Sequence, residues 1–334
     1  MKKILVVGGA GYIGSHMVKM LLEAGHDVVT LDNLSTGFRD AVPGGTFIEG
    51  DLGDRPLLDR LFAEHRFDAV MHFAAHIQVG ESVENPGKYY HNNVANTLCL
   101  LNAMVRRGTG NFIFSSTAAI FGEPEYVPVD EEHPKAPINP YGRSKWMVEQ
   151  MLNDFGRAHD LRSVCLRYFN AAGADPEGRL GWRYPGVTNL IPVVMQAASG
   201  VRPEIGVFGD DYDTPDGTGV RDYIHVVDLC QAHLLALQWL WAGRPRAVFN
   251  LGNGRGFSVQ QVIDTARAVT GREIPVRDGP RRAGDPATLV ADAARAHDAL
   301  GWRPRYAELA TIVEHAWRWE QRRVRIPEDQ RDEK

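Results

Sequence analysis

A glycine-rich loop near the start of the chain constrains the fold more than any other feature. Gly8, Gly11 and Gly14 stand between a short apolar run at 3–7 and a helical pattern at 12–23. In such a loop one glycine permits a tight turn, another lets a phosphate approach the backbone, and the last packs the helix on the strand. The unpaired N–H groups and the dipole of that helix then favour an anion. The loop therefore predicts a strand, a turn and a helix that bind a dinucleotide.

Strand-like and helix-like patterns alternate through the first half of the chain. Short apolar runs rich in β-branched residues are followed by segments whose apolar residues recur at helical spacing. Strands are expected at 3–7, 28–31, 46–48, 69–73, 112–114 and 163–166, and helices at 12–23, 56–65, 86–107 and 141–158. This alternation predicts an α/β fold, a Rossmann-type doubly wound parallel sheet covered by helices on both faces.

Acidic residues after two of the expected strands indicate which dinucleotide the chain binds. Asp32 ends the second strand about twenty residues after the glycines, where an acid accepts hydrogen bonds from the adenine ribose hydroxyls. Its carboxylate would repel a 2′-phosphate, so NAD is expected rather than NADP, although Arg39 stands close by. Asp51 follows the third strand and is placed to meet the adenine amino group.

The composition and the pattern of the sequence change after Asn170. Glycine, proline and aspartate crowd two loops, and helical patterns return with one short strand among them. The loops are at 173–186 and 209–219, the helices at 226–241, 259–269 and 306–319, and the strand at 247–251. The expected organisation is an NAD-binding Rossmann domain over 1–170, to which 220–250 returns, and a smaller mixed α/β domain over 171–334. The smaller domain is expected to pack on the carboxyl ends of the sheet.

A second motif, Tyr141-x-x-x-Lys145, opens the helix expected at 141–158. Positions i and i+4 share a helix face, so the ammonium of Lys145 is expected near the phenol of Tyr141. A nearby cation lowers the pKa of a tyrosine, which makes a base suited to an alcohol beside a bound nicotinamide. On an ordinary solvated helix the same pair would have no role. The dinucleotide loop and the strand ending in Ser115-Ser116-Thr117 favour the catalytic interpretation.

Four segments carry a resemblance to a known family. They are Gly-Gly-Ala-Gly-Tyr-Ile-Gly at 8–14, the Tyr/Lys motif, Leu-Arg-Tyr-Phe-Asn at 166–170 and Gly-Val-Arg-Asp-Tyr-Ile-His-Val at 219–226. Together they resemble the extended short-chain dehydrogenases/reductases and, within them, the UDP-glucose (UDP-galactose) 4-epimerases. The similarity runs from Lys3 to about Trp319, and the segments 79–83 and 281–285 are its more specific parts.

The resemblance implies a role for each matched position. Tyr141 would be the acid/base, Lys145 would bind the nicotinamide ribose, and Thr117, where the family usually has a serine, would hydrogen-bond the sugar 4-hydroxyl. The other positions that match cofactor contacts are Gly8, Gly11, Tyr12, Ile13, Gly14, Asp32, Asn33, Asp51, Leu52, Phe73, Ala74, Asn92 and Phe169. Those that match nucleotide-sugar contacts are Thr117, Asn170, Asn189, Leu190, Phe208, Arg221, Arg282, Asp285 and Leu289.

The activity that the resemblance implies is NAD-dependent interconversion of UDP-galactose and UDP-glucose at C4, through a transient 4-keto sugar. Sister 4,6-dehydratases carry Asp-Glu directly after the threonine, and sister decarboxylases tend to carry a glutamate nearby. Here Ala118 and Ala119 follow Thr117, so the general acid/base of those further steps is missing. A catalytically silent NAD sensor and a dehydrogenase that releases NADH are the interpretations from other classes.

Two departures from the family pattern leave the sugar open. Ile77 stands where the family often has a lysine, and Leu289 stands where a tyrosine excludes N-acetylated sugars and smaller residues admit them. The alternative is therefore 4-epimerisation of another UDP-sugar: UDP-GlcNAc/GalNAc, UDP-xylose/arabinose or UDP-glucuronate/galacturonate. The segment 181–186 fits no pattern of the family.

Composition and charge limit which partners and which cellular compartment are expected. The formal net charge is only −5 with both signs interspersed, which argues against nucleic acid and anionic membrane surfaces. No stretch is long enough to span a bilayer. The three cysteines are far apart and are expected to be buried thiols in a reducing compartment. A cytoplasmic protein that binds a small UDP-sugar is therefore expected.

Histidine spacing and the family pattern complete the expectations. The 12 histidines are scattered and form no H-E-x-x-H motif, so no metal site is expected. Members of the family commonly form homodimers through two helices, which here correspond to about 86–107 and 142–157. The resemblance therefore implies a homodimer.

Overall fold

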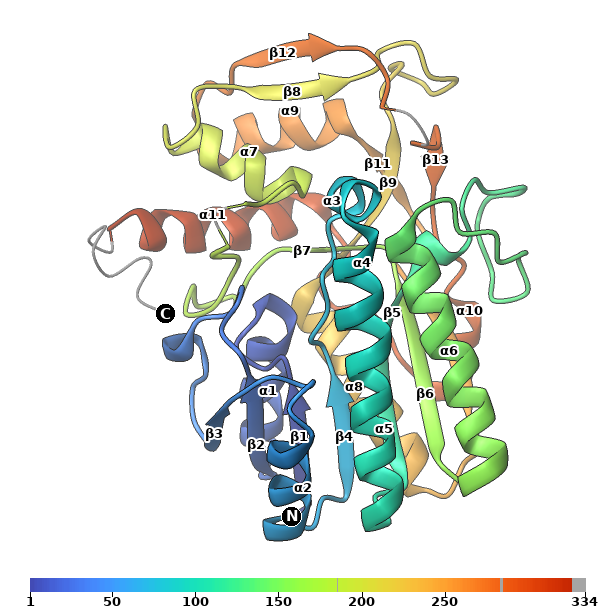
Figure 1. Cartoon of the computed structure of the whole chain (residues 1–334). Helices are drawn as coiled ribbons and strands as arrows, with labels where there is room; N and C mark the ends of the chain where they lie inside the picture. Colours follow the sequence, from blue (N-terminus) through green and yellow to red (C-terminus); the bar gives the residue numbers. More distant parts are fainter. Residues whose placement is uncertain (185, 283–284, 326–334) are drawn as a thin grey trace.

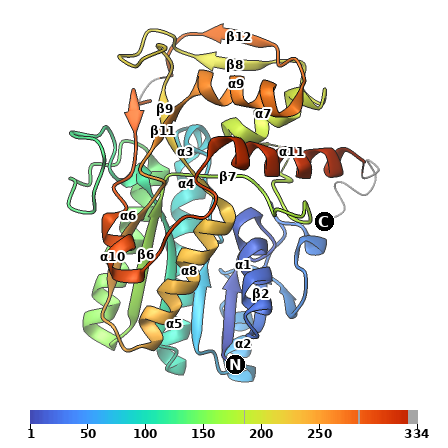
Figure 2. The same ribbon diagram turned by 180° about the vertical axis from the view of Figure 1, so that it is seen from behind.

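The computed structural model describes residues 1–184, 186–282 and 285–325. The remaining residues, which include parts of the 181–186 and 281–285 segments noted above, lie outside the described residues. Figures 1 and 2 show a large sheet wrapped by helices, with a smaller layer of helices and strands above one edge of that sheet.

The large sheet has seven strands, in the order β10-β6-β5-β4-β1-β2-β3. Every neighbouring pair in it is parallel. In chain order the strands are β1 (Lys3–Val7), β2 (Asp27–Asp32), β3 (Thr46–Glu49), β4 (Ala69–His72), β5 (Asn111–Thr117), β6 (Arg162–Tyr168) and β10 (Ala247–Leu251). The order reverses between β1 and β4, and the crevice outside the carboxyl ends at such a point is where doubly wound sheets bind ligands.

Helices cover both faces of this sheet, as the alternating patterns predict. In chain order they are α1 (Tyr12–Glu23), α2 (Arg55–Glu64), α5 (Asn96–Arg107), α6 (Pro140–His159) and α8 (Val226–Trp241). Successive residues of a strand point to opposite faces. Accordingly Ile4 and Val6 share a core with α1 and α8. Leu5 and Val7 share another with α2, α5 and α6. The doubly wound α/β class is therefore confirmed.

The long helix predicted before β5 forms, but it contains one wide turn. α4 (Pro86–Tyr89) passes into a π-helical turn over Tyr90–Ala95 and then into α5. Asn93 on this turn is buried; its side chain accepts the His76 N–H at 3.0 Å and donates to the His76 carbonyl at 3.0 Å. Asn93 also donates to Ser144 Oγ on α6 at 3.1 Å. The turn thus ties the chain after β4 to α6, in keeping with the frequent place of π turns at functional sites.

The smaller layer lies above the carboxyl ends of the parallel strands (Figure 1). Its strands are β7 (Asn170–Ala172), β8 (Ile205–Phe208), β9 (Val220–His225), β11 (Gly256–Ser258), β12 (Val276–Gly279) and β13 (Thr288–Leu289). Its helices are α7 (Leu190–Ala198), α9 (Val259–Thr270) and α11 (Leu309–Arg325), whereas α3 (Val79–Glu84) packs on α4 and α6, and α10 (Ala294–Leu300) lies beside α8. β9 pairs with β11, β13 and β7, and β8 pairs with β12. An apolar core of its own joins α7, α9 and α11.

One helix boundary differs from the prediction for a tertiary reason. The periodicity of the sequence predicts a helix from residue 306, but α11 begins at Leu309. The Asp228 carboxylate on α8 accepts the N–H groups of Arg305 and Tyr306 at 2.9 and 2.8 Å. These two residues are therefore fixed against α8 in a non-helical segment, and α11 begins only after it.

Membrane spans and thiols complete the description. Within the described ranges, no helix is both long and apolar enough to cross a membrane. Cys99, Cys165 and Cys230 carry free thiols, of which the last two are buried. Burial raises the pKa of the Cys165 and Cys230 thiols. They are therefore packing side chains rather than nucleophiles.

Gly14 tests the close approach of α1 to the glycine loop. A Cβ at Gly14 would lie 2.1 Å from the Gly8 carbonyl oxygen, whereas one at Gly87, also helical, would have no described neighbour within 4 Å. We expect Gly14→Ala to lower the free energy of unfolding by about 1–3 kcal/mol or more, because backbone must move. We expect Gly87→Ala to raise it by about 0.4–1 kcal/mol. Urea unfolding measures both, and wild-type stability in Gly14→Ala would contradict the close approach.

Candidate active site

A large cavity opens between the two layers, outside the carboxyl ends of β1, β4, β5 and β6. Its volume is about 1480 Å³, above the about 300–1,000 Å³ typical of a site for one small ligand. The glycine loop and the strand ends form one side, and residues of α7, β8, β9 and β13 form the other. The cavity has room for two molecules, and the predicted site residues divide between its two sides.

The geometry of the glycine loop fits a dinucleotide. Gly8 has a φ of +80°, and a Cβ there would lie 2.4 Å from the Ala74 nitrogen, so the turn requires glycine. Gly11 precedes α1 and caps it with no side chain, and Gly11, Tyr12 and Ile13 line the cavity. The first N–H groups of α1 are thus available to a pyrophosphate.

The remaining positions matched to cofactor contacts fall into two groups. Phe73, Tyr141, Lys145 and Phe169 line the cavity together with the glycine loop. Those outside its lining are Asp32, Asn33, Asp51, Leu52, Ala74 and Asn92.

Asp32 lies buried beside the glycine loop. Its carboxylate accepts the N–H groups of Ala10 and Leu34, both at 2.9 Å, and burial raises its pKa. A carboxylate has about four acceptor positions, so the expected contact with a ribose hydroxyl stays a prediction. Asp51 is likewise engaged, because it accepts the Asn33 side-chain amide at 2.7 Å.

Tyr141 and Lys145 lie at the start of α6, beside the end of β5. The Asn139 side chain caps α6 by accepting the Gly142 N–H at 2.9 Å. The helix therefore begins before Tyr141 and includes both residues. Tyr141 and Lys145 both line the cavity. The Thr117 hydroxyl, at the end of β5, hydrogen-bonds to the Tyr141 side chain. The packing of α6 on β5 therefore brings the predicted catalytic side chains together.

The charge relation expected between Tyr141 and Lys145 is wrong in this structure. Burial raises the pKa of Tyr141, and the hydrogen bond with Thr117 offsets only part of that rise. Lys145 instead donates to the Ser115 carbonyl at 2.9 Å, and burial lowers its pKa to about 7. A partly neutral amine bound to a carbonyl does not hold Tyr141 as a phenolate. The pair needs a further source of positive charge before Tyr141 becomes a strong base.

A buried ion pair fixes α6 against β5 and β6. Glu149 accepts a hydrogen bond from Ser116 Oγ at 2.6 Å, and from Arg167 Nε and Nη2 at 3.0 and 2.7 Å. Glu149 and Arg167 are only 1% and 3% exposed. Moving one partner away would leave an uncompensated buried charge. The contact therefore sets the position of α6, and with it that of Tyr141 and Lys145, over the strands.

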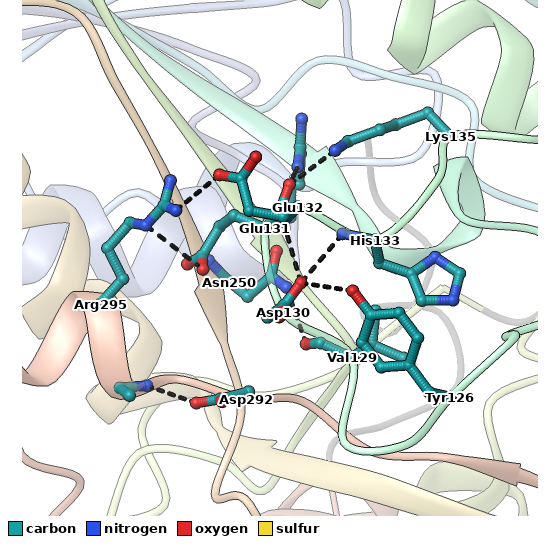
Figure 3. Close-up of polar contacts among 12 residues, drawn as sticks. Tyr126, Val129, Asp130, Glu131, Glu132, His133, Lys135, Asn250, Asp292 and Arg295 are labelled. Carbon is teal, nitrogen blue, oxygen red and sulfur yellow. Dashed lines mark hydrogen bonds and ion pairs between the residues drawn. The ribbon is translucent and has the colours of Figure 1, made fainter.

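A polar cluster anchors the loop that leads from β5 into α6 (Figure 3). Asp130 accepts the His133 N–H at 2.9 Å and so closes a local turn. Glu131 accepts the Asn250 N–H at 2.7 Å, at the end of β10, and its Oε2 lies 3.5 Å from Arg295 Nε on α10. Burial raises the pKa of Glu131. The loop is thus joined to the far edge of the sheet rather than left mobile above the cavity.

Leu289 is held from two sides. In β13 it lies opposite Arg221 of β9. Beyond β13, Val129 of the anchored loop donates to the Val290 carbonyl at 2.8 Å and accepts the Asp292 N–H at 2.8 Å. The Leu289 side chain packs on the apolar cluster that contains Val129. Its position at the cavity wall is therefore well defined.

All positions matched to nucleotide-sugar contacts line the cavity. They are Thr117, Asn170, Asn189, Leu190, Phe208, Arg221, Arg282, Asp285 and Leu289. Arg221 Nη2 lies 3.6 Å from Asp285 Oδ1, and the Arg282 guanidinium lies 3.9 Å over the Phe208 ring. Forked guanidinium donors suit phosphate oxygens, so this side of the cavity offers a second phosphate site.

Several cavity residues are not among those predicted from the sequence. The most prominent are Trp182, Arg183 and Tyr184, from the unexplained 181–186 segment. An arginine between two aromatic residues in a glycine-rich loop is a signal for a site. Spacing could not indicate what this run covers, because Arg183 contacts Asp40, which lies 143 positions away.

The histidines take part in packing and hydrogen bonding. His72 Nε2 lies 3.0 Å from Thr97 Oγ1, and His225 Nε2 lies 3.0 Å from His315 Nδ1. Burial is the main cause that lowers the pKa of His72 and of His225 to about 3, so both rings are neutral. Within the part of the chain that the structure describes, no group of three or more His, Cys, Asp or Glu residues could hold a metal ion.

Comparisons with known proteins identify the family of this chain. The profile of the NAD dependent epimerase/dehydratase family matches residues 4–252. A UDP-glucose 4-epimerase of Azospirillum brasilense is 54% identical over 319 residues, which span 95% of this chain and 92% of that protein. The crystal structure of UDP-glucose 4-epimerase from Brucella ovis in complex with NAD has a TM-score of 0.93 and 48% identity, over 95% of this chain and 98% of that one. UDP-glucose 4-epimerase from Bifidobacterium longum in complex with NAD⁺ and UDP has a TM-score of 0.91 and 40% identity, over 96% and 98% of the two chains.

Lys145 provides a pH-dependent test in protein stripped of cofactor. Burial lowers its pKa to about 7, against about 10.4 in the unfolded chain, so between these values the unfolded state binds more protons. The contribution of Lys145 to the free energy of unfolding therefore rises with pH above about 7, by at most about 1.4 kcal/mol per unit, and is lost as pH falls through that value.

Lys145→Met removes this dependence. We expect urea unfolding at pH values from about 7 to about 9 to show a stability difference that grows in favour of wild type. Stability curves that stay parallel over that window would contradict a buried amine at this position.

Proposed function

The chain belongs to the NAD dependent epimerase/dehydratase family, and we propose that it interconverts UDP-galactose and UDP-glucose by inversion at C4 through a transient 4-keto sugar. One observation carries this proposal. The Tyr141–Thr117 pair lines the same cavity as the glycine loop on one side and Arg221 and Arg282 on the other. A dinucleotide and a nucleotide sugar would thus meet at a proton-transferring phenol.

The residues of the larger layer fit NAD. The first N–H groups of α1 would bind its pyrophosphate, Asp32 would favour an adenine ribose without a 2′-phosphate, and Lys145 would hold the nicotinamide ribose. When bound, NAD would supply the redox chemistry that the proposed reaction needs at C4 of the sugar, namely the acceptance and return of a hydride. The positive charge that Tyr141 lacks in this structure fits an oxidised nicotinamide near the phenol.

Tyr141 and Thr117 would move the proton. Their side chains hydrogen-bond to each other at the cavity wall, so a sugar 4-hydroxyl that joins them can pass its proton to Tyr141 and later recover it. Ala118 and Ala119, which follow Thr117, carry no acid. Further elimination from the keto sugar therefore lacks a base at this place, and simple inversion is favoured.

Arg221 and Arg282 would anchor the diphosphate while the sugar turns. The two guanidinium groups line the upper side of the cavity and are fixed by Asp285 and Phe208 respectively. Turning needs a firmly held diphosphate and a loosely held sugar, and two forked guanidinium groups suit the firm hold on the diphosphate. We therefore assign NAD binding mainly to residues 1–170, to which α8 and β10 of the 220–250 segment return, and nucleotide-sugar binding to the rest of 171–334, including β9 with Arg221.

The alternative is a 4-epimerase of another UDP-sugar. Leu289 is intermediate in size at the cavity wall, and Ile77, also in the lining, is apolar. The deciding experiment offers UDP-galactose, UDP-GalNAc, UDP-xylose and UDP-galacturonate separately and follows C4 inversion by NMR, with NADH absorbance recorded in parallel. We expect UDP-galactose to be converted with no stoichiometric NADH. Inversion of another sugar alone would favour the alternative, and steady NADH production would indicate a dehydrogenase.

The proposal extends to the cellular setting. Galactose metabolism in the cytoplasm is the setting that suits the activity. The free thiols Cys99, Cys165 and Cys230 support a reducing compartment.

Tyr141→Phe tests the assigned acid/base. We expect this variant to retain NAD through purification and to lose about 10²–10⁴-fold in kcat, because the N–H groups of α1 would bind the pyrophosphate whereas the phenol would carry the proton. Turnover of UDP-galactose and the NAD content of the protein are the two measurements. Tyr306→Phe, outside the cavity lining, is the matched control and should keep wild-type turnover. Near-normal kcat in Tyr141→Phe would overturn the assignment.

A homodimer through α5 and α6 is a separate part of the proposal. The two helices pack against each other, and Leu98 and Met147 on them are 40% and 44% exposed, so apolar side chains of both helices are open to a second copy. We expect sedimentation to show a dimer that Leu98→Asp with Met147→Asp weakens at least about tenfold. Val201→Asp, at an exposed apolar residue after α7, should leave the dimer intact. A monomeric wild type would contradict this interface.

A further inference from the structure

Residues 181–184 form a wall of the cavity that neither the family pattern nor the proposed chemistry uses. Trp182, Arg183 and Tyr184 line the cavity, and so do Phe38 and Ala41, from the segment after β2. Two stretches far apart in the chain therefore meet on the side of the cavity that carries the glycine loop.

Arg183 joins these two stretches. Its Nη1 lies 2.5 Å from Asp40 Oδ1, and its guanidinium lies 4.2 Å over the Phe38 ring. The Arg183 side chain is only 8% exposed, whereas Asp40 is 65% exposed. An exposed ion pair alone contributes little, but stacking on an aromatic face adds a second, less solvated attraction. Arg183 thus holds the wall to the segment after β2 by an ion pair, which salt weakens, and by a stack on an aromatic ring, which salt affects less.

Phe38 is itself fixed to the glycine loop. Its N–H donates to the Ala10 carbonyl at 3.1 Å, and a Cβ on Gly37 would lie 2.8 Å from the Ala10 Cβ. Phe38 also shares a small buried cluster with Ala41 and Leu180, the residue that precedes the wall. The surface on which Arg183 stacks is therefore hydrogen-bonded to the dinucleotide loop and packed against it.

Trp182 ties the same wall to the first turn of α1. Its ring centroid lies 5.0 Å from that of Tyr12, and its carbonyl accepts the Trp319 indole N–H at 2.8 Å. The Tyr12 hydroxyl donates to the Gly173 carbonyl at 2.7 Å, at the start of the same connection. Tyr12 is one of the residues whose N–H groups would face the pyrophosphate. The wall therefore lies over the end of α1 that binds the dinucleotide.

We propose that Arg183 retains the dinucleotide by closing this wall over the cofactor side of the cavity. The inference rests on the proposed function only in taking NAD as the resident cofactor. Release of a dinucleotide requires the wall to separate from the segment after β2, which breaks both the ion pair with Asp40 and the stack on Phe38.

The test is the rate at which the purified holoenzyme loses NAD. Bound NAD is chased with excess etheno-NAD, a fluorescent analogue, and the exchange is followed by fluorescence, independently of turnover. We expect Arg183→Ala to release NAD at least about tenfold faster than wild type. Asp40→Asn removes the ion pair but keeps the stack, so its rate should lie between the two. Because the ion pair is the salt-sensitive part, added salt should accelerate release from wild type more than from Asp40→Asn.

Arg179→Ala is the matched control. Arg179 lies in the same connection, pairs with Asp175 and Glu177, and does not line the cavity. Its variant should exchange NAD at the wild-type rate. Equal rates for wild type, Arg183→Ala and Asp40→Asn would overturn the inference while leaving NAD binding and epimerisation intact. If Arg183→Ala does not fold, the exposed Asp40→Asn change decides alone. A wild type that neither carries nor binds NAD would instead overturn the proposed function, and this inference with it.

Discussion

The packing of α6 on the ends of β5 and β6 is the constraint on which the candidate active site depends. The Glu149 carboxylate reaches Ser116 on one strand and Arg167 on the other, away from water. Tyr141 and Lys145 precede Glu149 on the same helix face. α6 cannot slide or rotate without unpairing a buried charge, so the phenol is placed beside Thr117 by a contact that does not line the cavity.

The two sides of the cavity are joined to each other by the chain itself and by hydrogen bonds. The chain passes from β9, which carries Arg221, directly into α8, which covers the large sheet. In the other direction, Asn250 at the end of β10 meets Glu131 of the loop that leads into α6. β13 is held between β9 and that same loop. Such cross-links make the cavity a fixed space rather than a cleft between independent units, and a fixed space suits the proposed reaction, in which only the sugar would turn.

The electrostatics of the Tyr/Lys pair show where reasoning from spacing falls short. Helical spacing correctly predicts that Tyr141 and Lys145 reach the same cavity. It assumes, however, that the charge of a lysine is always available. In the folded chain desolvation penalises both charged forms, and the Ser115 carbonyl is the hydrogen-bond partner of Lys145. The competing acceptor comes from another element, so no local pattern could have revealed it.

Local sequence patterns predicted the helices and strands whose formation depends mainly on neighbouring residues. The observed bounds of β1, α1, α8 and β10 coincide with those expected from apolar spacing, and the glycine loop lies where its strand–turn–helix context required. The strands β7, β8, β9, β11, β12 and β13 were not expected from apolar spacing, and each is formed by pairing with another strand of this group. The wide turn at Tyr90–Ala95, the late start of α11 and the contact of Arg183 with Asp40 likewise depend on partners distant in the chain. The sequence thus determined which chemistry the chain carries, whereas only tertiary packing decided which groups meet, because burial and long-range pairing set both their positions and their charges.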